Sequence, residues 1–219
     1  MTPAIPSLVR CAMVLVAAAL AGCSILPEKT EVALFAPDPR VTTDPAWPAV
    51  DWQLVVPRPA GAALVDSPRI TVRPSPGELQ VYKSAAWTQP ALDLVQDAVV
   101  HGFEDSGRIG GVARRGEGIN ADYQLLLDVR RFDSDYNDPG VTSGPAAVVE
   151  IGAKLLADDS DQVVANRVFR VSVPARATDV ASVAAAFKEA LGLATHDIVG
   201  WTLAEGNRHA GAARAADDD

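Results

Sequence analysis

Residues 149–171 read VEIGAKLLADDSDQVVANRVFRV, two alternating segments joined by an acidic connection. In the first segment every second residue is apolar: Val149, Ile151, Ala153 and Leu155. The second segment repeats this pattern: Val163, Ala165, Phe169 and Val171. Such alternation is typical of strands with one buried face. The short polar connection at 158–161 therefore predicts an antiparallel hairpin, in which Arg167 is the exception on the apolar side.

Further strands are predicted before this hairpin. Apolar residues alternate with polar ones in the stretch 123–129: Tyr123, Leu125, Leu127 and Val129. Short runs with strand character lie at 31–35, 52–56, 69–73, 78–83 and 108–112. Between the runs at 69–73 and 78–83 the chain reads Pro74-Ser75-Pro76-Gly77, which is strong turn chemistry. These runs predict short strands that precede a meander of three long ones.

Two helices are predicted from apolar residues spaced three and four apart. The first follows an N-cap at Thr88, has Pro90 in its first turn and ends at Gly107. Its stripe consists of Leu92, Val95, Val99 and Phe103. The second covers 179–205, and its stripe consists of Val180, Val183, Phe187, Leu191, Ala194, Ile198 and Trp201. Gly192 and Gly200 lower its helix propensity, so we expect a bend or close packing there.

This element order predicts an α/β (α+β) two-layer sandwich. Two main helices would pack on one face of a mixed, largely antiparallel sheet. We expect a signal peptide at 1–22 and a lipidated tether at 23–50, because ten of the 16 prolines lie between Pro27 and Pro76. The folded domain would cover 51–206, followed by a disordered acidic tail at 207–219.

The overall charge excludes one broad class of function. The 219 residues carry 28 acidic and 19 basic side chains, a net charge of −9. A nucleic-acid-binding protein needs a basic surface to track phosphates, so this class is disfavoured. The chain has only two cysteines and three histidines, so it offers few of the ligands from which zinc sites are built. We predict neither a cofactor nor a resident metal.

The N-terminal segment predicts export. Arg10 precedes eleven apolar residues at 11–21, a run too short to cross a bilayer but of the length found in signal peptides. The run ends in Leu20-Ala21-Gly22-Cys23, which resembles the bacterial lipobox in all four positions. The resemblance implies lipid transfer to the Cys23 sulfur, cleavage before it and acylation, as by palmitate, of the new amino group. A thiolate is the nucleophile that this chemistry needs. Ser24 resembles the outer-membrane default at the following position.

Two segments partly match known ligand-binding motifs but lack elements that those motifs require. Residues 116–121 match G-x-G-x-x-A, but a predicted strand follows them where a dinucleotide site needs a helix, so a glycine-rich loop is expected. Asp133, Asp135 and Asp138 begin like a calcium loop but lack its glycine and its bidentate acid. We interpret them as an acidic surface loop, with weak calcium binding as the alternative.

Two aromatic residues are the predicted docking positions for a partner. Trp87 lies between a strand and a helix, and Tyr82 lies on the preceding strand. Aromatic side chains with a polar tip are enriched where proteins bind one another. Trp201, in contrast, belongs to the buried stripe of the second helix.

The same region carries a resemblance to a known family. Val81-Tyr82-Lys83-Ser84, then Trp87, Pro90-Ala91-Leu92 and Ser106-Gly107-Arg108-Ile109 resemble the ABC-type transport auxiliary lipoprotein family. Asp122-Tyr123-Gln124-Leu125, opening a long strand, extends the likeness. The resemblance implies a non-enzymatic outer-membrane lipoprotein that docks a periplasmic Mce-domain protein and, through it, an inner-membrane permease and ATPase. Lipid transport between the membranes would be its task, and a homo-oligomer is compatible with it.

Two other functions fit parts of the sequence. A small domain on a proline-rich tether also suits a lipoprotein activator or scaffold for a cell-wall synthase. An envelope hydrolase would have to use Asp128, His101 or His196, and the sequence contains no nucleophile elbow and no Walker A motif. We therefore expect a docking protein and not an enzyme.

Overall fold

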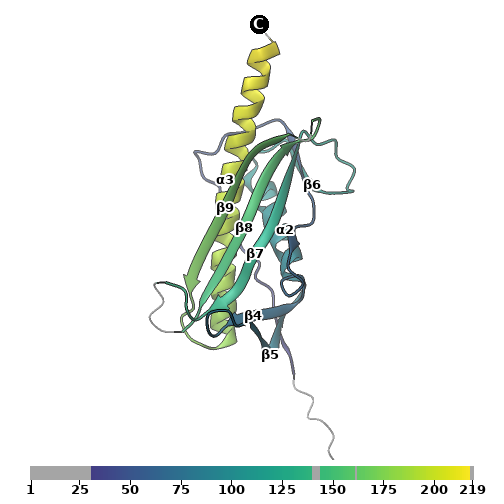
Figure 1. Cartoon of the computed structure of the whole chain (residues 1–219). Coiled ribbons are helices and arrows are strands. Elements are labelled where there is room, and N and C mark those ends of the chain that lie inside the picture. Colours follow the sequence, from purple (N-terminus) through teal and green to yellow (C-terminus); the bar gives the residue numbers. More distant parts are fainter. Residues whose placement is uncertain (1–30, 140–143, 161, 218–219) are drawn as a thin grey trace, which may run out of the picture. The chain divides into compact units, whose positions relative to one another are not determined.

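The computed structural model describes residues 31–139, 144–160 and 162–217. Three long antiparallel strands form the largest part of a nine-stranded mixed sheet, with β9 at its edge (Figure 1): β7 (Tyr123–Asp135), β8 (Ala146–Ala157) and β9 (Val163–Pro174). Ile151 lies opposite Phe169 in the β8–β9 hairpin, as the alternation predicts. The fold class predicted from the sequence is confirmed.

The other edge of β7 is shared by three short parallel strands. β2 (Gln53–Val56) pairs with its start, β3 (Ala60–Gly61) with its middle and β4 (Arg69–Arg73) with its end. β7 is long enough to form hydrogen bonds with all three short strands, one after another along its length. β7 is the element that holds the sheet together.

Three more short strands complete the sheet. β6 (Gly111–Arg114) pairs with β2 in parallel, and β5 (Gln80–Trp87) pairs with β4 as an antiparallel hairpin. β1 (Ala33–Phe35) is an edge strand parallel to β5. Gly77 adopts φ 80° in the β4–β5 turn, a conformation that favours glycine.

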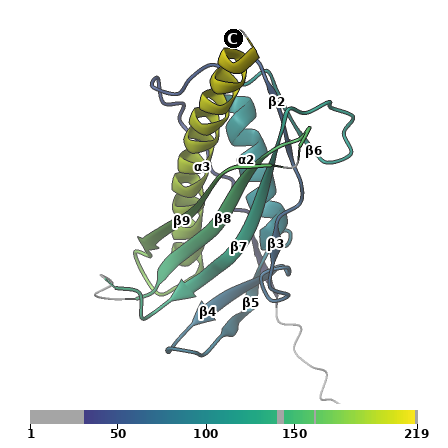
Figure 2. The same ribbon diagram turned by 45° about the horizontal axis from the view of Figure 1, so that its top comes forward.

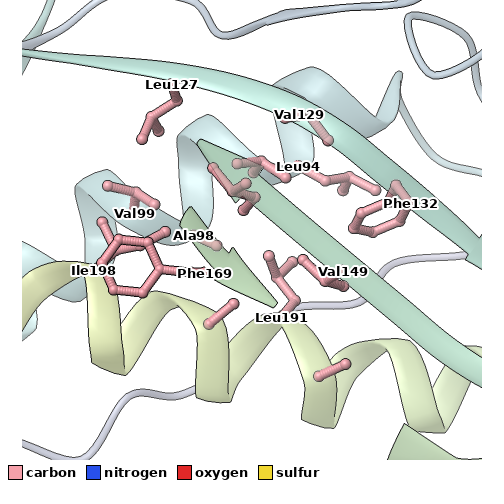
Figure 3. Close-up of a cluster of buried hydrophobic side chains, with 14 of the residues drawn as sticks. Leu94, Ala98, Val99, Leu127, Val129, Phe132, Val149, Phe169, Leu191 and Ile198 are labelled. Carbon is pink, nitrogen blue, oxygen red and sulfur yellow. The ribbon is translucent and has the colours of Figure 1, made fainter. Parts of the chain in front are cut away.

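Helices α2 (Ala91–Ser106) and α3 (Val180–Asp217) cover one face of the sheet (Figure 2). Their predicted stripes are buried except for Val180 and Trp201, which are partly buried. Val99, Leu191 and Ile198 meet the sheet side chains Val149 and Phe169 in the core (Figure 3). Burying such side chains contributes about 1.5–3 kcal/mol each to folding. Neither helix of the described residues covers the opposite face.

The exception in the hairpin pattern has a structural explanation. The guanidinium of Arg167 lies over the ring of Phe169, 5.0 Å from its centroid, and Phe169 packs edge-on against Trp201. A cation over an aromatic face is favourable. Arg167 can thus occupy an apolar position at the margin of the sheet.

Three boundaries differ from the prediction. Helix α2 begins after Pro90, with no side-chain cap, so the predicted cap at Thr88 is wrong, while Gly107 ends the helix at φ 58° as expected. The folded unit begins at Val32, because β1 joins the sheet and Trp47 is buried, so residues 32–50 are not a tether. Helix α3 continues to Asp217, so the predicted disorder after residue 206 is also wrong up to that point.

Candidate docking surfaces

The predicted lipobox residues Leu20, Ala21, Gly22 and Cys23 lie outside the described residues. Among the described helices none is both long and apolar enough to cross a bilayer.

The structure contradicts the docking role predicted for Trp87. Its side chain is only 1 % exposed and packs edge-on against Phe132 and Phe187, with ring centroids 5.8 and 5.1 Å away. β5 ends at Trp87, which points inward beneath the helices because the sheet's apolar face continues to this residue. Trp87 is a core residue and is unavailable to a partner.

Tyr82 is half-buried on the same strand. Its hydroxyl shares a hydrogen bond of 3.2 Å with the hydroxyl of Ser134, which is fully buried. Burial raises the pKa of Tyr82, and the bond to Ser134 opposes that shift. Tyr82 thus ties β5 to the end of β7 while part of its ring stays accessible.

The acidic residues predicted to form a surface loop are buried and neutralised by arginines. The Arg131 guanidinium lies 2.6 Å from Asp133 Oδ1 and 2.7 Å from Asp135 Oδ2, and Arg73 contacts Asp133 from β4 at 3.4 Å. Burial pushes the pKa of Asp135 upward, but hydrogen bonds from Arg131 and the Asn137 amide outweigh it, so this pKa falls below its ordinary value. Hydrogen bonds to Asp133 and Asp135 raise the pKa of Arg131.

The third acidic residue has its own arginine. Asp138 accepts a hydrogen bond from Arg170 on β9, which also contacts Glu150 at 3.6 Å. In the described part of the chain no group of three or more His, Cys, Asp or Glu residues is arranged to hold a metal ion. Two groups of ion pairs thus neutralise these carboxylates: one joins β4 to β7, and the other joins β9 to β8 and to the segment after β7.

Two exposed apolar side chains lie on and immediately before the edge strand β1. Leu34 is 65 % exposed and Val32 51 %. The outer edge of β1 has no strand beside it in the described residues. We name Val32 and Leu34 the hairpin corner. The sequence signal for it was the edge strand at 31–35, but no pattern showed which side chains the fold leaves uncovered.

Comparison with known proteins identifies the family. The model of the ABC-type transport auxiliary lipoprotein component matches residues 33–199. The chain belongs to this family. The match begins at β1 and ends within α3, so the family's domain includes the segment that the sequence suggested was a tether.

Two relatives extend the comparison. The crystal structure of XCC0632 from Xanthomonas campestris, a DUF330 protein, is 52 % identical, with a TM-score of 0.78, and the match covers 82 % of this chain and 99 % of that one. The uncharacterized protein bll6063 from Bradyrhizobium diazoefficiens is 28 % identical over 160 residues. That match covers 73 % of this chain but only 41 % of the relative, so the chain spans about two fifths of its length.

The auxiliary lipoprotein family is a class of transport component and not of enzyme. The candidate hydrolase residues also lie apart: Asp128, His101 and His196 line three different hollows of the surface. The glycine-rich residues 116–121 form a loop before β7, with Gly116 and Gly118 at φ 96° and 80°. No helix follows this loop to face a pyrophosphate, consistent with the interpretation as a connection.

Proposed function

We propose that the chain is the outer-membrane auxiliary lipoprotein of an Mce-type transport system. It would be anchored through Cys23 and dock the periplasmic Mce-domain protein, so that lipid passes between the two membranes. The observation that carries the proposal is the family match over residues 33–199, and the lipobox-like sequence at 20–23 adds to it.

The anchor follows from lipid chemistry. Each buried CH₂ of an acyl chain contributes about 0.8 kcal/mol to membrane binding, and one chain alone holds a protein only transiently. A triacylated Cys23 would hold the body at the membrane almost permanently. Only residues 24–31 would then separate the lipid from the folded unit that begins at Val32.

The hairpin corner is the surface that we assign to docking. Its exposed Leu34 and Val32 lie on and immediately before an edge strand whose outer hydrogen-bonding groups face outward. A strand edge with apolar side chains is a ready template for pairing with another chain. Tyr82, on the neighbouring strand, offers a partly accessible aromatic ring beside it.

Site-specific photo-crosslinking in intact cells of the native host tests the proposal. Benzoylphenylalanine replaces Leu34, and we expect an ultraviolet-dependent adduct that mass spectrometry identifies as an Mce-domain protein. Lys188, exposed on α3, is the control position and should give no such adduct. An adduct with a penicillin-binding protein would favour the cell-wall scaffold instead. The absence of any Mce adduct at Leu34 would refute docking at this corner.

A further inference from the structure

A groove of about 240 Å³ runs across β7, β8 and β9 on the sheet face that neither α2 nor α3 covers. Five side chains and backbone positions define what we name the open-face groove: Leu126, Arg130, Gly152, Lys154 and Val168. All five belong to residues that the structure describes. Neither the core nor the hairpin corner uses this surface.

Gly152 builds the floor of the groove. A β-carbon there would lie 3.1, 3.2 and 3.3 Å from the Nη2, Nε and Cζ atoms of Arg130. Three nearly equal distances mean that the planar guanidinium lies flat against the β8 backbone. Any larger residue at 152 would lift it, because these contacts are already tighter than ordinary van der Waals distance. The glycine thus fixes where the Arg130 charge is held.

The groove is a positive site on a negative protein. The lining contains three cations, Arg130, Lys154 and Arg167, and one carboxylate, Asp128, whose Oδ2 is 3.4 Å from Arg130 Nε. The Arg167 guanidinium lies over the Phe169 ring, which leaves Arg130 and Lys154 to a ligand. Lys154 makes no ion pair within the described residues. The whole chain has a net charge of −9, so cations left in excess here favour an anionic ligand.

Apolar side chains flank the charges. Leu126 on β7 is 36 % exposed and Val168 on β9 46 %. The register places Lys154 opposite Leu126, and Gly152 opposite Val168. Charged and apolar groups therefore alternate within one shallow groove. A ligand that satisfies both must carry a negative group and a hydrocarbon part.

We propose that the open-face groove binds a phospholipid, with the phosphate on Arg130 and Lys154 and the start of an acyl chain against Leu126 and Val168. This inference rests on the proposed function and names the surface that its cargo would contact. A planar guanidinium can donate two parallel hydrogen bonds to a phosphate, which makes arginine the favoured partner. Free phosphate would leave both apolar side chains uncovered, and an acidic peptide lacks the hydrocarbon chain.

The test is photo-crosslinking of the full chain in native cells grown with ³²P-phosphate. Benzoylphenylalanine replaces Asn166, an exposed residue at the margin of the groove. We expect an adduct that carries ³²P and whose mass fits a phospholipid with its acyl chains. The double variant Arg130→Gln, Lys154→Gln should lower the yield at least fivefold, because it removes both cations without reaching the core.

A matched control keeps the test selective. Arg176→Gln with Lys188→Gln removes the same charge from exposed positions that make no ion pair in the described structure, and should leave the yield unchanged. No lipid adduct at 166, a protein adduct there, or a lipid yield that ignores Arg130 and Lys154 would each overturn the inference. The Mce adduct at Leu34 is scored separately, so loss of docking and loss of lipid binding are distinguishable.

Discussion

The indole of Trp47 lies directly on Gly200 of α3. A β-carbon on Gly200 would be 2.4 Å from the Trp47 Nε1 atom. Six residues further along the helix, Gly206 receives Trp52 in the same way, with a β-carbon 2.6 Å from the ring. These glycines let two tryptophans of the segment before β2 pack on the helix backbone. The close packing expected at Gly200 is confirmed.

Gly200→Ala should therefore destabilise the protein although alanine is the better helix former. Overpacking costs ~1–3 kcal/mol, and the rigid ring places this case near the upper end. The improved helix propensity offsets about 1 kcal/mol of that. We expect the free energy of unfolding, measured in urea, to fall by about 1–2 kcal/mol.

Gly211→Ala is the control for this substitution. Gly211 lies on the same helix with nothing within 4 Å of its β-carbon position, so alanine there should stabilise by up to about 1 kcal/mol. In a Trp47→Ala background the penalty of Gly200→Ala should disappear. If Gly200→Ala is harmless with Trp47 present, the contact does not have the energetic role described.

The same contact shows what the sequence could and could not predict. Helix periodicity predicted which face of α3 is buried, because neighbours three and four apart lie in one chain segment. Trp47 gave no such signal, since its partner lies about 150 residues away and prolines surround it. Proline content indicated a tether, whereas an apolar indole with a glycine seat favours packing. Long-range contacts of this kind are not encoded in local patterns.

Trp87→Ala should act through stability and not through docking. The substitution removes a side chain that packs edge-on against both Phe132 and Phe187, whose rings stack on each other. Such truncations cost about 3–5 kcal/mol. We expect this decrease in the free energy of unfolding measured in urea. The yield of the Mce adduct should fall only in proportion to the fraction of protein that is unfolded. Leu34→Ser, at the exposed hairpin corner, should leave stability within about 0.5 kcal/mol and abolish an Mce adduct formed by benzoylphenylalanine placed at Val32 instead. If Trp87→Ala abolished the adduct without lowering stability, while Leu34→Ser left the adduct intact, Trp87 would again be a candidate docking residue.

The end of α3 should contribute to stability although its composition indicated disorder. His209 Nδ1 lies 3.0 Å from the hydroxyl of Tyr123, which is buried at the start of β7. Deleting residues 207–219 removes this partner and should lower the free energy of unfolding by about 1 kcal/mol. Deleting only 215–219 should have no measurable effect, because residues 215 and 216 are exposed. Equal stability of both truncations would show that the contact is unimportant.

The acidic cluster illustrates a second limit of sequence patterns. The spacing of Asp133, Asp135 and Asp138 correctly predicted that they lie close together in the chain. It also suggested that they form an exposed loop, whereas all three are buried. The residues that neutralise them come from different strands: Arg73 from β4 and Arg170 from β9. Only the sheet topology brings these guanidinium groups to the carboxylates. The charge of a site thus depends on partners that the local sequence does not contain.

Asp135 should make stability depend on acidity in a defined direction. Because its pKa is lowered in the folded protein, its contribution is complete above the unfolded value of about 3.9 and is lost as the pH falls through the folded value. Urea unfolding between pH 2 and 7 should show wild type more stable than Asp135→Asn at neutral pH. This advantage should shrink below about pH 4, where the carboxylate becomes protonated first in the unfolded chain and then, at lower pH, in the folded protein, so that Arg131 loses its charged partner. Asp159→Asn, at an exposed position without a hydrogen bond in the described structure, should follow wild type throughout. A difference that stays constant down to pH 2 would mean that the Arg131–Asp135 pair does not stabilise the fold through its charge.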